Sequence, residues 1–117
     1  MRGDEARVIR AFVAWLEAEG WSVEQEVGFC DVVARRDGVT MFVEAKGETQ
    51  AIGTDVDTMY GQILRRMPIA ENESYRFAVV VPTRARDAAL RVPRRTRELL
   101  RISVYEVTAE SVVHELT

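Results

Sequence analysis

The sequence predicts a mixed α/β domain in which helices flank a central mixed sheet of four or five strands. Three observations predict this fold class: an amphipathic helical pattern opens the chain, two β-rich runs follow around an Asp-Gly pair, and strand-like and helical segments then alternate. The expected order is α-β-β-β-α-β-α-β. A chain of 117 residues is long enough for one core, so residues 1–117 are expected to form one domain.

The first predicted element is a helix over Asp4–Glu19. Its apolar side chains recur every three or four residues, and Gly20 is placed to end it. A short alternating segment, Val23–Val27, predicts the first strand. These two elements bring the chain to the β-rich runs.

A β-hairpin is the most specific local prediction. The runs Phe29–Arg36 and Val39–Lys46 are separated only by Asp37-Gly38, and an Asp-Gly pair between alternating segments is the strongest short hairpin signal. A two-residue turn fixes the register, so Arg36 pairs with Val39 and the numbers of all later partners sum to the same value.

The second half is expected to complete the sheet and its helical layer. Thr54 is expected to N-cap a helix that runs to Met67, with Asp57 completing a capping box. The remaining predicted elements are a strand at Tyr75–Val81, short helices at Arg84–Arg91 and Pro93–Leu100, a strand at Ile102–Val107, and a possible last strand in the tail from Val112.

Composition excludes several classes of protein. Apolar residues make up 47% of the chain and charged residues 30%, as in soluble globular domains. The longest apolar run, Phe77–Val81, is too short to span a bilayer, and the N-terminus lacks the apolar core of a secretory signal. One cysteine cannot form an intrachain disulfide. A soluble, cytoplasmic protein without membrane association is therefore expected.

Charge is distributed unevenly along the chain. Residues 1–60 carry six basic and twelve acidic side chains, whereas residues 61–101 carry ten arginines and four acids. This suits a protein that holds cations beside a polyanion. Two oppositely charged surfaces that only keep the domain soluble are the simpler interpretation, and charge alone favours that one.

The hairpin register brings two carboxylates together. Asp31 falls opposite Glu44 on one face, and strand alternation adds Lys46 to that face. Facing like charges are destabilising unless they are neutralised, and Mg²⁺ binds one or two carboxylates while keeping water ligands. Lys46 could instead form a simple salt bridge. However, it is the only lysine among sixteen basic residues, and an ammonium group suits water activation better than a guanidinium.

This arrangement resembles the PD-(D/E)XK, or restriction-endonuclease-like, nuclease superfamily. The resemblance rests on Asp31, Glu44-Ala45-Lys46, their hairpin and the order of the surrounding elements; Cys30 stands where many members have proline. It implies a restriction-endonuclease-like core. It also implies that Asp31, Glu44 and the carbonyl of Ala45 bind Mg²⁺, with Mn²⁺ as a substitute, while Lys46 positions the attacking water.

Two further residues are candidate catalytic groups. Glu5 shares the inward face of the first helix, and several members of the superfamily place a first-helix glutamate beside the metal; a favourable interaction with the helix dipole explains it equally well. Gln62 lies in the helix after the motif, where some lineages carry a glutamine that contacts the lysine or the substrate. Ordinary helix polarity is its alternative explanation.

Arginines are the candidate contacts to nucleic acid, because guanidinium groups match phosphate geometry. Arg65 and Arg66 follow Gln62, and Arg66 could share its face. Arg94, Arg97 and Arg101 are spaced to line one face of a short helix. A solvated helix surface is an equally good interpretation of these arginines.

The sequence therefore predicts a Mg²⁺-dependent nuclease acting on nucleic acid, with DNA as the expected substrate. A nuclease-fold module that only binds nucleic acid or a protein partner is the alternative. The domain could also belong to a larger repair, restriction or mobile-element complex, or form a homodimer that serves both strands of a duplex.

Overall fold

The computed structural model describes residues 2–27, 30–48, 50–67 and 74–116. Its strands are β1 (Ser22–Val27), β2 (Cys30–Arg36), β3 (Val39–Ala45), β4 (Tyr75–Pro82), β5 (Ile102–Val107) and β6 (Val113–Leu116). Its helices are α1 (Arg2–Ala18), α2 (Ile52–Arg66), α3 (Arg86–Ala89) and α4 (Arg94–Leu100), and a 3₁₀ turn, η1 (Thr83–Ala85), precedes α3.

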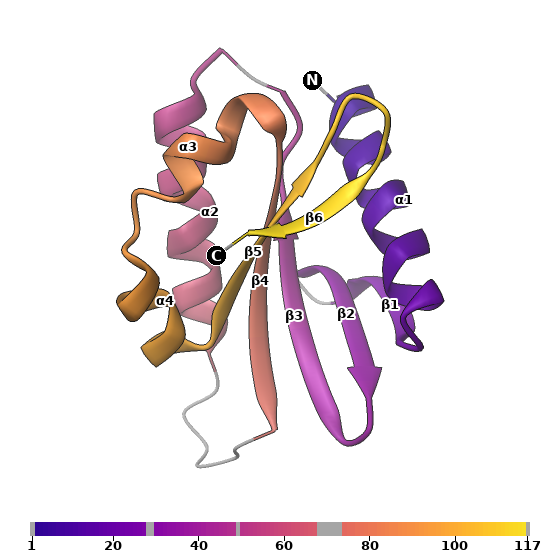
Figure 1. Ribbon diagram of the computed structural model, residues 1–117. Coiled ribbons are helices and arrows are strands. Elements are labelled where there is room, and N and C mark those ends of the chain that lie inside the picture. Colours follow the sequence, from indigo (N-terminus) through magenta and orange to yellow (C-terminus); the bar gives the residue numbers. More distant parts are fainter. Residues whose placement is uncertain (1, 28–29, 49, 68–73, 117) are drawn as a thin grey trace.

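The strands form one mixed sheet in the order β1-β2-β3-β4-β5-β6 (Figure 1). β1, β2 and β3 run antiparallel to one another, β3, β4 and β5 run parallel, and β6 is antiparallel to β5. Helices connect the parallel strands, as parallel pairing requires. The predicted mixed α/β fold, with helices flanking a central mixed sheet, is confirmed, although the described residues form six strands rather than the four or five expected.

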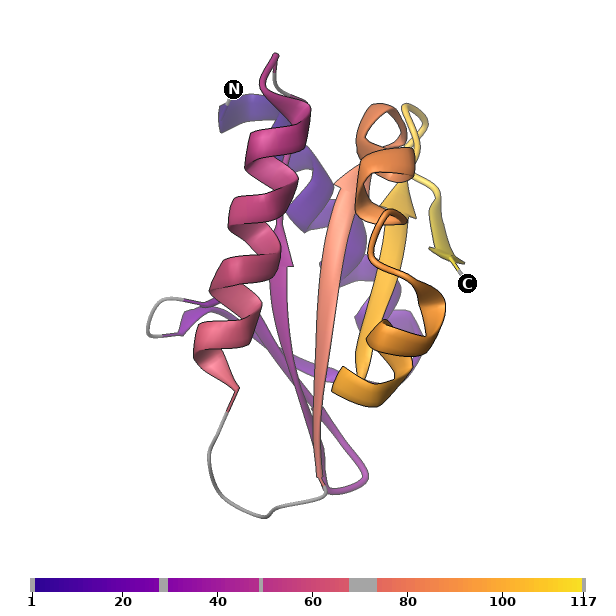
Figure 2. The same cartoon turned by 90° about the vertical axis from the view of Figure 1, so that its left-hand side faces the viewer.

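Two apolar clusters hold helices on opposite faces of the sheet (Figure 2). Phe12 and Leu16 of α1 are buried against one face, and Met59 and Ile63 of α2 against the other. β4 lies in the middle, so both sets of its alternating side chains are buried and its sequence is almost wholly apolar.

The hairpin has the predicted register. Arg36 pairs with Val39, and Val32 pairs with Val43. Asp37 and Gly38 have φ values of 51° and 79°, which are the positive angles that the right-handed twist of a two-residue hairpin favours. Phe29, which was expected to open β2, lies outside the described residues.

Helix α1 ends as the sequence predicts. Gly20 has a φ of 94°, its N–H donates to the carbonyl of Glu17, and the N–H of Trp21 donates to the carbonyl of Leu16. This pair of hydrogen bonds is a Schellman motif, in which glycine accepts the left-handed conformation without a steric cost.

The prediction for the start of α2 is wrong. The helix begins at Ile52 with Ala51 as its N-cap, so Thr54 and Asp57 lie within it and form no capping box. Ile52 packs against the cluster that contains Val56, which adds a turn of helix ahead of the expected cap. Local capping preference is worth about 1 kcal/mol, so burial of apolar side chains can override it.

The segment predicted as one helix over Arg84–Arg91 is divided into η1 and α3. Ala85, Ala88 and Ala89 are buried in the cluster beneath α2, and these small side chains let the short segment lie close to the sheet. No helix within the described ranges combines the length and the apolar character needed to cross a bilayer.

Tyr60 makes stability sensitive to alkaline pH. Its hydroxyl donates to the carbonyl of Ala89 at 2.5 Å, and burial raises its pKa to about 12 against the opposing effect of Arg97. Burial and the charge of Glu115 likewise raise the pKa of Tyr105 to about 12. The neutral phenols are therefore favoured in the folded state, and their contribution to stability is present below about pH 10 and lost as the pH rises through about 12.

We therefore expect the free energy of unfolding to fall steeply between about pH 10 and pH 12. Tyr60→Phe should cost about 1 kcal/mol at pH 8, because the Ala89 carbonyl loses its donor, and should make the alkaline decrease shallower. Urea unfolding followed by circular dichroism at both pH values measures this. If the free energy of unfolding of Tyr60→Phe fell as steeply with pH as that of the native protein, the alkaline loss of stability could not be assigned to Tyr60.

Candidate active site

Asp31 lies at the start of β2, next to the end of β3. Its Oδ2 atom accepts a hydrogen bond of 2.8 Å from the backbone N–H of Ala45. Because Val32 pairs with Val43, the next position along the hairpin sets Asp31 beside Glu44, as the register predicts. The main chain of β3 therefore fixes the Asp31 carboxylate over the Glu44-Ala45 peptide.

Glu44 is buried, with an exposed fraction of 3%. Its Oε2 atom lies 3.2 Å from Nε of Arg66, which is close enough for an ion pair although the N–H direction does not meet hydrogen-bond geometry. A buried carboxylate is costly unless a positive charge accompanies it. The guanidinium at the end of α2 supplies that charge.

This contact shows where the structure places Arg66, and its role as a nucleic-acid contact stays a prediction. The sequence indicated a nucleic-acid contact on the surface of α2, but the Arg66 side chain is only 19% exposed and is directed at the sheet. Spacing within α2 could not show that a buried glutamate on β3 would draw this arginine inward. Arg65, the preceding residue, is exposed as predicted.

Lys46 follows the last residue of β3. Its N–H donates to the carbonyl of Val80 at 3.0 Å, so the parallel ladder with β4 continues through this residue. Strand alternation then places Lys46 on the face of Glu44. Lys46 as a whole residue is partly exposed.

Glu5 approaches the same place from α1. Burial raises the pKa of the Glu5 carboxyl, the negative charge of Asp31 raises it further, and Lys46 and the N-terminal amine oppose this shift. Glu5 is therefore within electrostatic reach of both Asp31 and Lys46. The expected position of a first-helix carboxylate beside the pair agrees with this structure, and its catalytic role stays a prediction.

Gly47 allows this approach. It is buried, and a Cβ atom added to it would lie 2.4 Å from the backbone N of Glu5 and 2.8 Å from its Cα. The next residue holds the contact in place, because the N–H of Glu48 donates to the Asp4 carboxylate at 2.5 Å. The motif loop and the first turn of α1 thus touch through their main chains. The sequence shows the glycine, but not this contact.

The residues present fit a hard divalent cation. Asp31 and Glu44 provide two carboxylates, and the Ala45 carbonyl belongs to the residue whose N–H anchors Asp31. The described residues contain no group of three His, Cys, Asp or Glu side chains suited to a metal, but Mg²⁺ keeps several waters and needs only one or two carboxylates. The negative charge of Asp31 contributes to the raised pKa of Glu5, as expected where acidic side chains gather.

Gln62 lies one turn before Arg66, on the side of α2 that faces β3. The carbonyl of Gln62 accepts a hydrogen bond of 3.3 Å from Nη1 of Arg66. Its side-chain Oε1 is buried and has no hydrogen-bond partner among the described residues. The predicted sharing of a face by Gln62 and Arg66 is confirmed, and the amide oxygen remains available as an acceptor beside the site.

The arginines of α4 do not form the predicted row. Arg94 is exposed and pairs with Glu98 at 3.1 Å, whereas Arg97 is 5% exposed and donates from Nε to the carbonyl of Val92 at 2.9 Å. Arg101 lies beyond the helix end with a φ of 60°. Arg97 therefore does not lie on the surface expected for it, because the short helix turns this side chain back over its own N-terminal loop.

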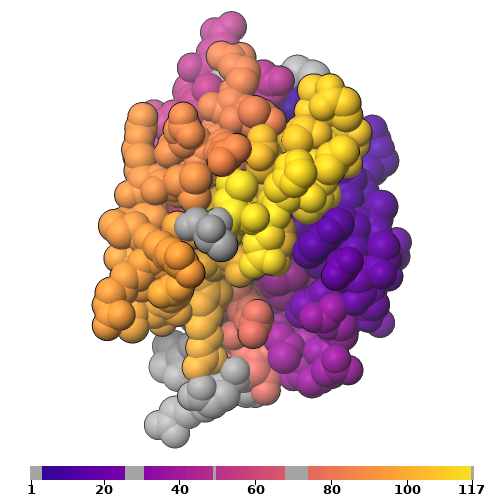
Figure 3. All heavy atoms as spheres, in the orientation of Figure 1, coloured from indigo at the N-terminus to yellow at the C-terminus, as the bar shows by residue number. Residues whose placement is uncertain are grey.

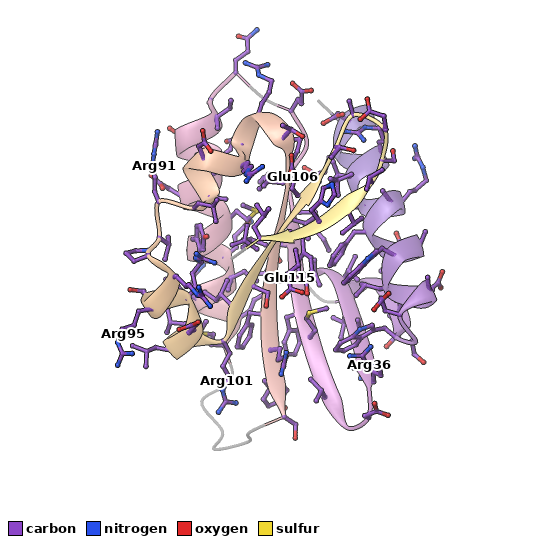
Figure 4. The ribbon with its side chains drawn as sticks, viewed as in Figure 1. Arg36, Arg91, Arg95, Arg101, Glu106 and Glu115 are labelled. Atoms are coloured by element: carbon purple, nitrogen blue, oxygen red, sulfur yellow. The ribbon has the colours of Figure 1, made fainter. Side chains whose placement is uncertain are left out.

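Sequence reasoning missed Glu106, a buried acid at the carboxyl end of β5 (Figure 4). Thr83 donates its hydroxyl to Glu106 Oε2 at 2.6 Å, and Nη1 of Arg86 lies 3.6 Å from Oε1. Thr83 and Glu106 border a surface cavity of about 430 Å³ that is also lined by Arg7, Glu48 and Arg84. A single acid within an otherwise apolar strand was the available signal.

Solved structures of other proteins have a fold similar to that of this chain. An XisH family protein from Nostoc punctiforme matches with a TM-score of 0.61 and 19% identity, over 95% of this chain and 99% of that chain. An fdxN element excision controlling factor protein from Anabaena variabilis matches with a TM-score of 0.63 and 19% identity, over 96% and 99%. No protein-family model and no curated protein sequence matches the chain. At this identity the likeness shows a shared fold.

Gly47→Ala tests the contact between the motif loop and α1. The new methyl group would overlap the Glu5 backbone, so we expect a loss of about 1–3 kcal/mol in the free energy of unfolding. Gly53→Ala is the control, because its Cβ would meet only Nη1 of Arg91 at 3.9 Å and helix propensity favours alanine there. Urea unfolding of both variants gives the comparison. Equal stability would show that the two main chains are not in tight contact.

Proposed function

We propose that this protein is a divalent-metal-dependent nuclease that hydrolyses phosphodiester bonds in DNA. The observation that carries the proposal is the fixed geometry where the start of β2 meets the end of β3. Ala45 holds the Asp31 carboxylate by a main-chain hydrogen bond, Glu44 lies beside it, and Lys46 shares the face of Glu44. Two carboxylates and an ammonium group on rigid strands suit metal-assisted hydrolysis.

Asp31, Glu44 and the Ala45 carbonyl would hold Mg²⁺ or Mn²⁺, which supplies Lewis-acid activation of the phosphoryl group and lowers the pKa of a bound water. Lys46 would orient that water by hydrogen bonding and offset the negative charge that develops on the phosphate. Glu5, with its raised pKa, would accept or donate a proton beside Lys46. Gln62 would hydrogen-bond a water or the substrate through its buried Oε1.

The similar solved structures support nucleic acid as the substrate class. One of them is described as a controlling factor for excision of the fdxN element. The basic segment of this chain, including the exposed Arg65, would supply sequence-independent contacts to phosphates.

One observation favours a second candidate function. Arg66 already provides a positive charge next to Glu44, so the site is partly neutralised by the protein itself. A nuclease-fold module that binds nucleic acid or a protein partner without cleaving it would have this property. Metal binding and cleavage distinguish the two functions.

Cleavage of plasmid, linear and branched DNA, and of RNA, in Mg²⁺ or Mn²⁺ tests the nuclease directly. Lys46→Ala should lower the rate by about 10²–10³-fold, because it removes a charge that acts on the transition state. Arg10→Gln, on the exposed side of α1, should leave the rate unchanged. Absence of cleavage by the native protein, or equal rates for native protein and Lys46→Ala, would favour the non-catalytic module.

Arg66 is expected to oppose cation binding at Glu44. Arg66→Gln should therefore tighten Mn²⁺ binding about tenfold at pH 8. A tenfold change in affinity corresponds to about 1.4 kcal/mol of altered charge interaction between the site and the cation. The same change should lower stability without metal, because it leaves Glu44 without this guanidinium. Arg65→Gln is the matched control one residue away. Titration calorimetry that shows identical affinities for both variants would refute competition between Arg66 and the cation.

A further inference from the structure

Arg7 of α1 connects segments that are far apart in the sequence. Its Nε donates to Asp4 Oδ1 at 3.1 Å, and its Nη1 donates to the carbonyl of Thr108 at 2.8 Å and to the hydroxyl of Ser111 at 3.2 Å. Asp4 uses its other oxygen, Oδ2, to accept the N–H of Glu48 at 2.5 Å. The loop that follows Lys46 is therefore linked through α1 to the turn between β5 and β6.

The turn between β5 and β6 offers Arg7 a well-braced partner. The Thr108 carbonyl also accepts the N–H of Ser111 at 2.9 Å, and the Thr108 hydroxyl accepts the N–H of Val112 at 3.1 Å. Ser111 has a φ of 64°, a left-handed conformation that is uncommon for serine and that the hydrogen bonds of the turn hold in place. Figure 1 shows this turn beside the amino end of α1. A guanidinium bound to it therefore has a defined position.

The Arg7–Asp4 pair is more than a surface contact. The side chain of Arg7 is 25% exposed and that of Asp4 is 16% exposed, so solvent and salt screen the pair less than they screen an exposed one. Both oxygens of the Asp4 carboxylate accept a hydrogen bond, and the planar guanidinium donates at both of its ends. The pair therefore fixes an orientation as well as a charge.

This network restrains the backbone around Lys46. On one side, the N–H of Lys46 itself donates to the Val80 carbonyl of β4 at 3.0 Å. On the other side, the N–H of Glu48 is held by Asp4, and Gly47 between them is buried against the first turn of α1. The main chain that carries the ammonium group is thus held by the sheet and by α1.

We propose that Asp4 and Arg7 are positioning residues that hold Lys46 in place for cleavage through the main chain of Glu48. This inference rests on the proposed function, because its effect on the rate is assigned to Lys46. Neither side chain needs to touch the substrate. Misplacing a reacting group by about 1 Å can cost about 10²-fold in rate, so the restraint should act on kcat more than on KM.

Two variants and a matched control test the proposal. Arg7→Lys keeps the positive charge, but a flexible ammonium cannot replace the fixed plane of donors that spans Asp4 and the turn. Asp4→Asn leaves one oxygen in place of two, so the contact with Arg7 or the contact with Glu48 is lost. Arg10→Lys, on the exposed side of α1, is the control. Backbone amide hydrogen exchange by NMR and the kinetics of DNA cleavage in Mg²⁺ are measured, and the spectra show that each variant is folded.

Both variants should speed exchange of the Glu48 amide about tenfold and leave that of the Ala45 amide, which Asp31 holds, nearly unchanged. Both should lower kcat about tenfold with KM within about twofold, and Arg10→Lys should change neither. Unchanged exchange at Glu48, or faster exchange with native kcat, would overturn the positioning role. In the second case the nuclease proposal stands, because the native protein cleaves. If the native protein cleaves nothing, the proposed function and the positioning role both fail, whatever the exchange shows.

Discussion

The neutralisation of Glu44 is the constraint on which the candidate site depends. A carboxylate with 3% exposure on a central strand cannot remain charged without a nearby cation, and here Arg66 from α2 approaches it to 3.2 Å. This pairing ties α2 to β3 at the same place where Asp31 is held by the Ala45 amide. The fold thus brings two acids together, and a guanidinium group from helix α2 neutralises part of their negative charge.

The surrounding architecture maintains this concentration of charge. The hairpin turn sets the register of β2 and β3, and the Gly47 contact brings the first turn of α1 against the end of β3. In Figure 3 the yellow carboxyl-terminal segment lies between indigo α1 and the orange segment of α3 and α4, on the face that Figure 1 shows. Asp31 and Glu44 lie in β2 and β3, in a sheet that α1 covers on one face and α2 on the other, so the acids are on rigid elements rather than on loops.

Local sequence signals predicted the elements whose cause is local. Asp37-Gly38 fixed the hairpin and Gly20 the end of α1, because both positions need positive φ angles that few residues adopt. The prediction that Asp31 lies opposite Glu44 followed from the hairpin register, and strand alternation added Lys46 to that face. Thr54 and Arg97 were misplaced, and the ion pair of Arg66 was not foreseen, because these environments depend on contacts between distant elements: burial of Ile52, the loop before α4, and the acid on β3. Such contacts leave no periodic signal in the sequence.

The central claim is that Asp31 and Glu44 together hold one divalent cation. Titration calorimetry with Mn²⁺, on the native protein and on Asp31→Asn, Glu44→Gln and the double variant, tests it most directly. The account predicts one ion per chain for the native protein, a similar large loss of affinity in each single variant, and little further loss in the double variant, since the two ligands act as a unit. Unchanged affinity in either single variant would contradict it.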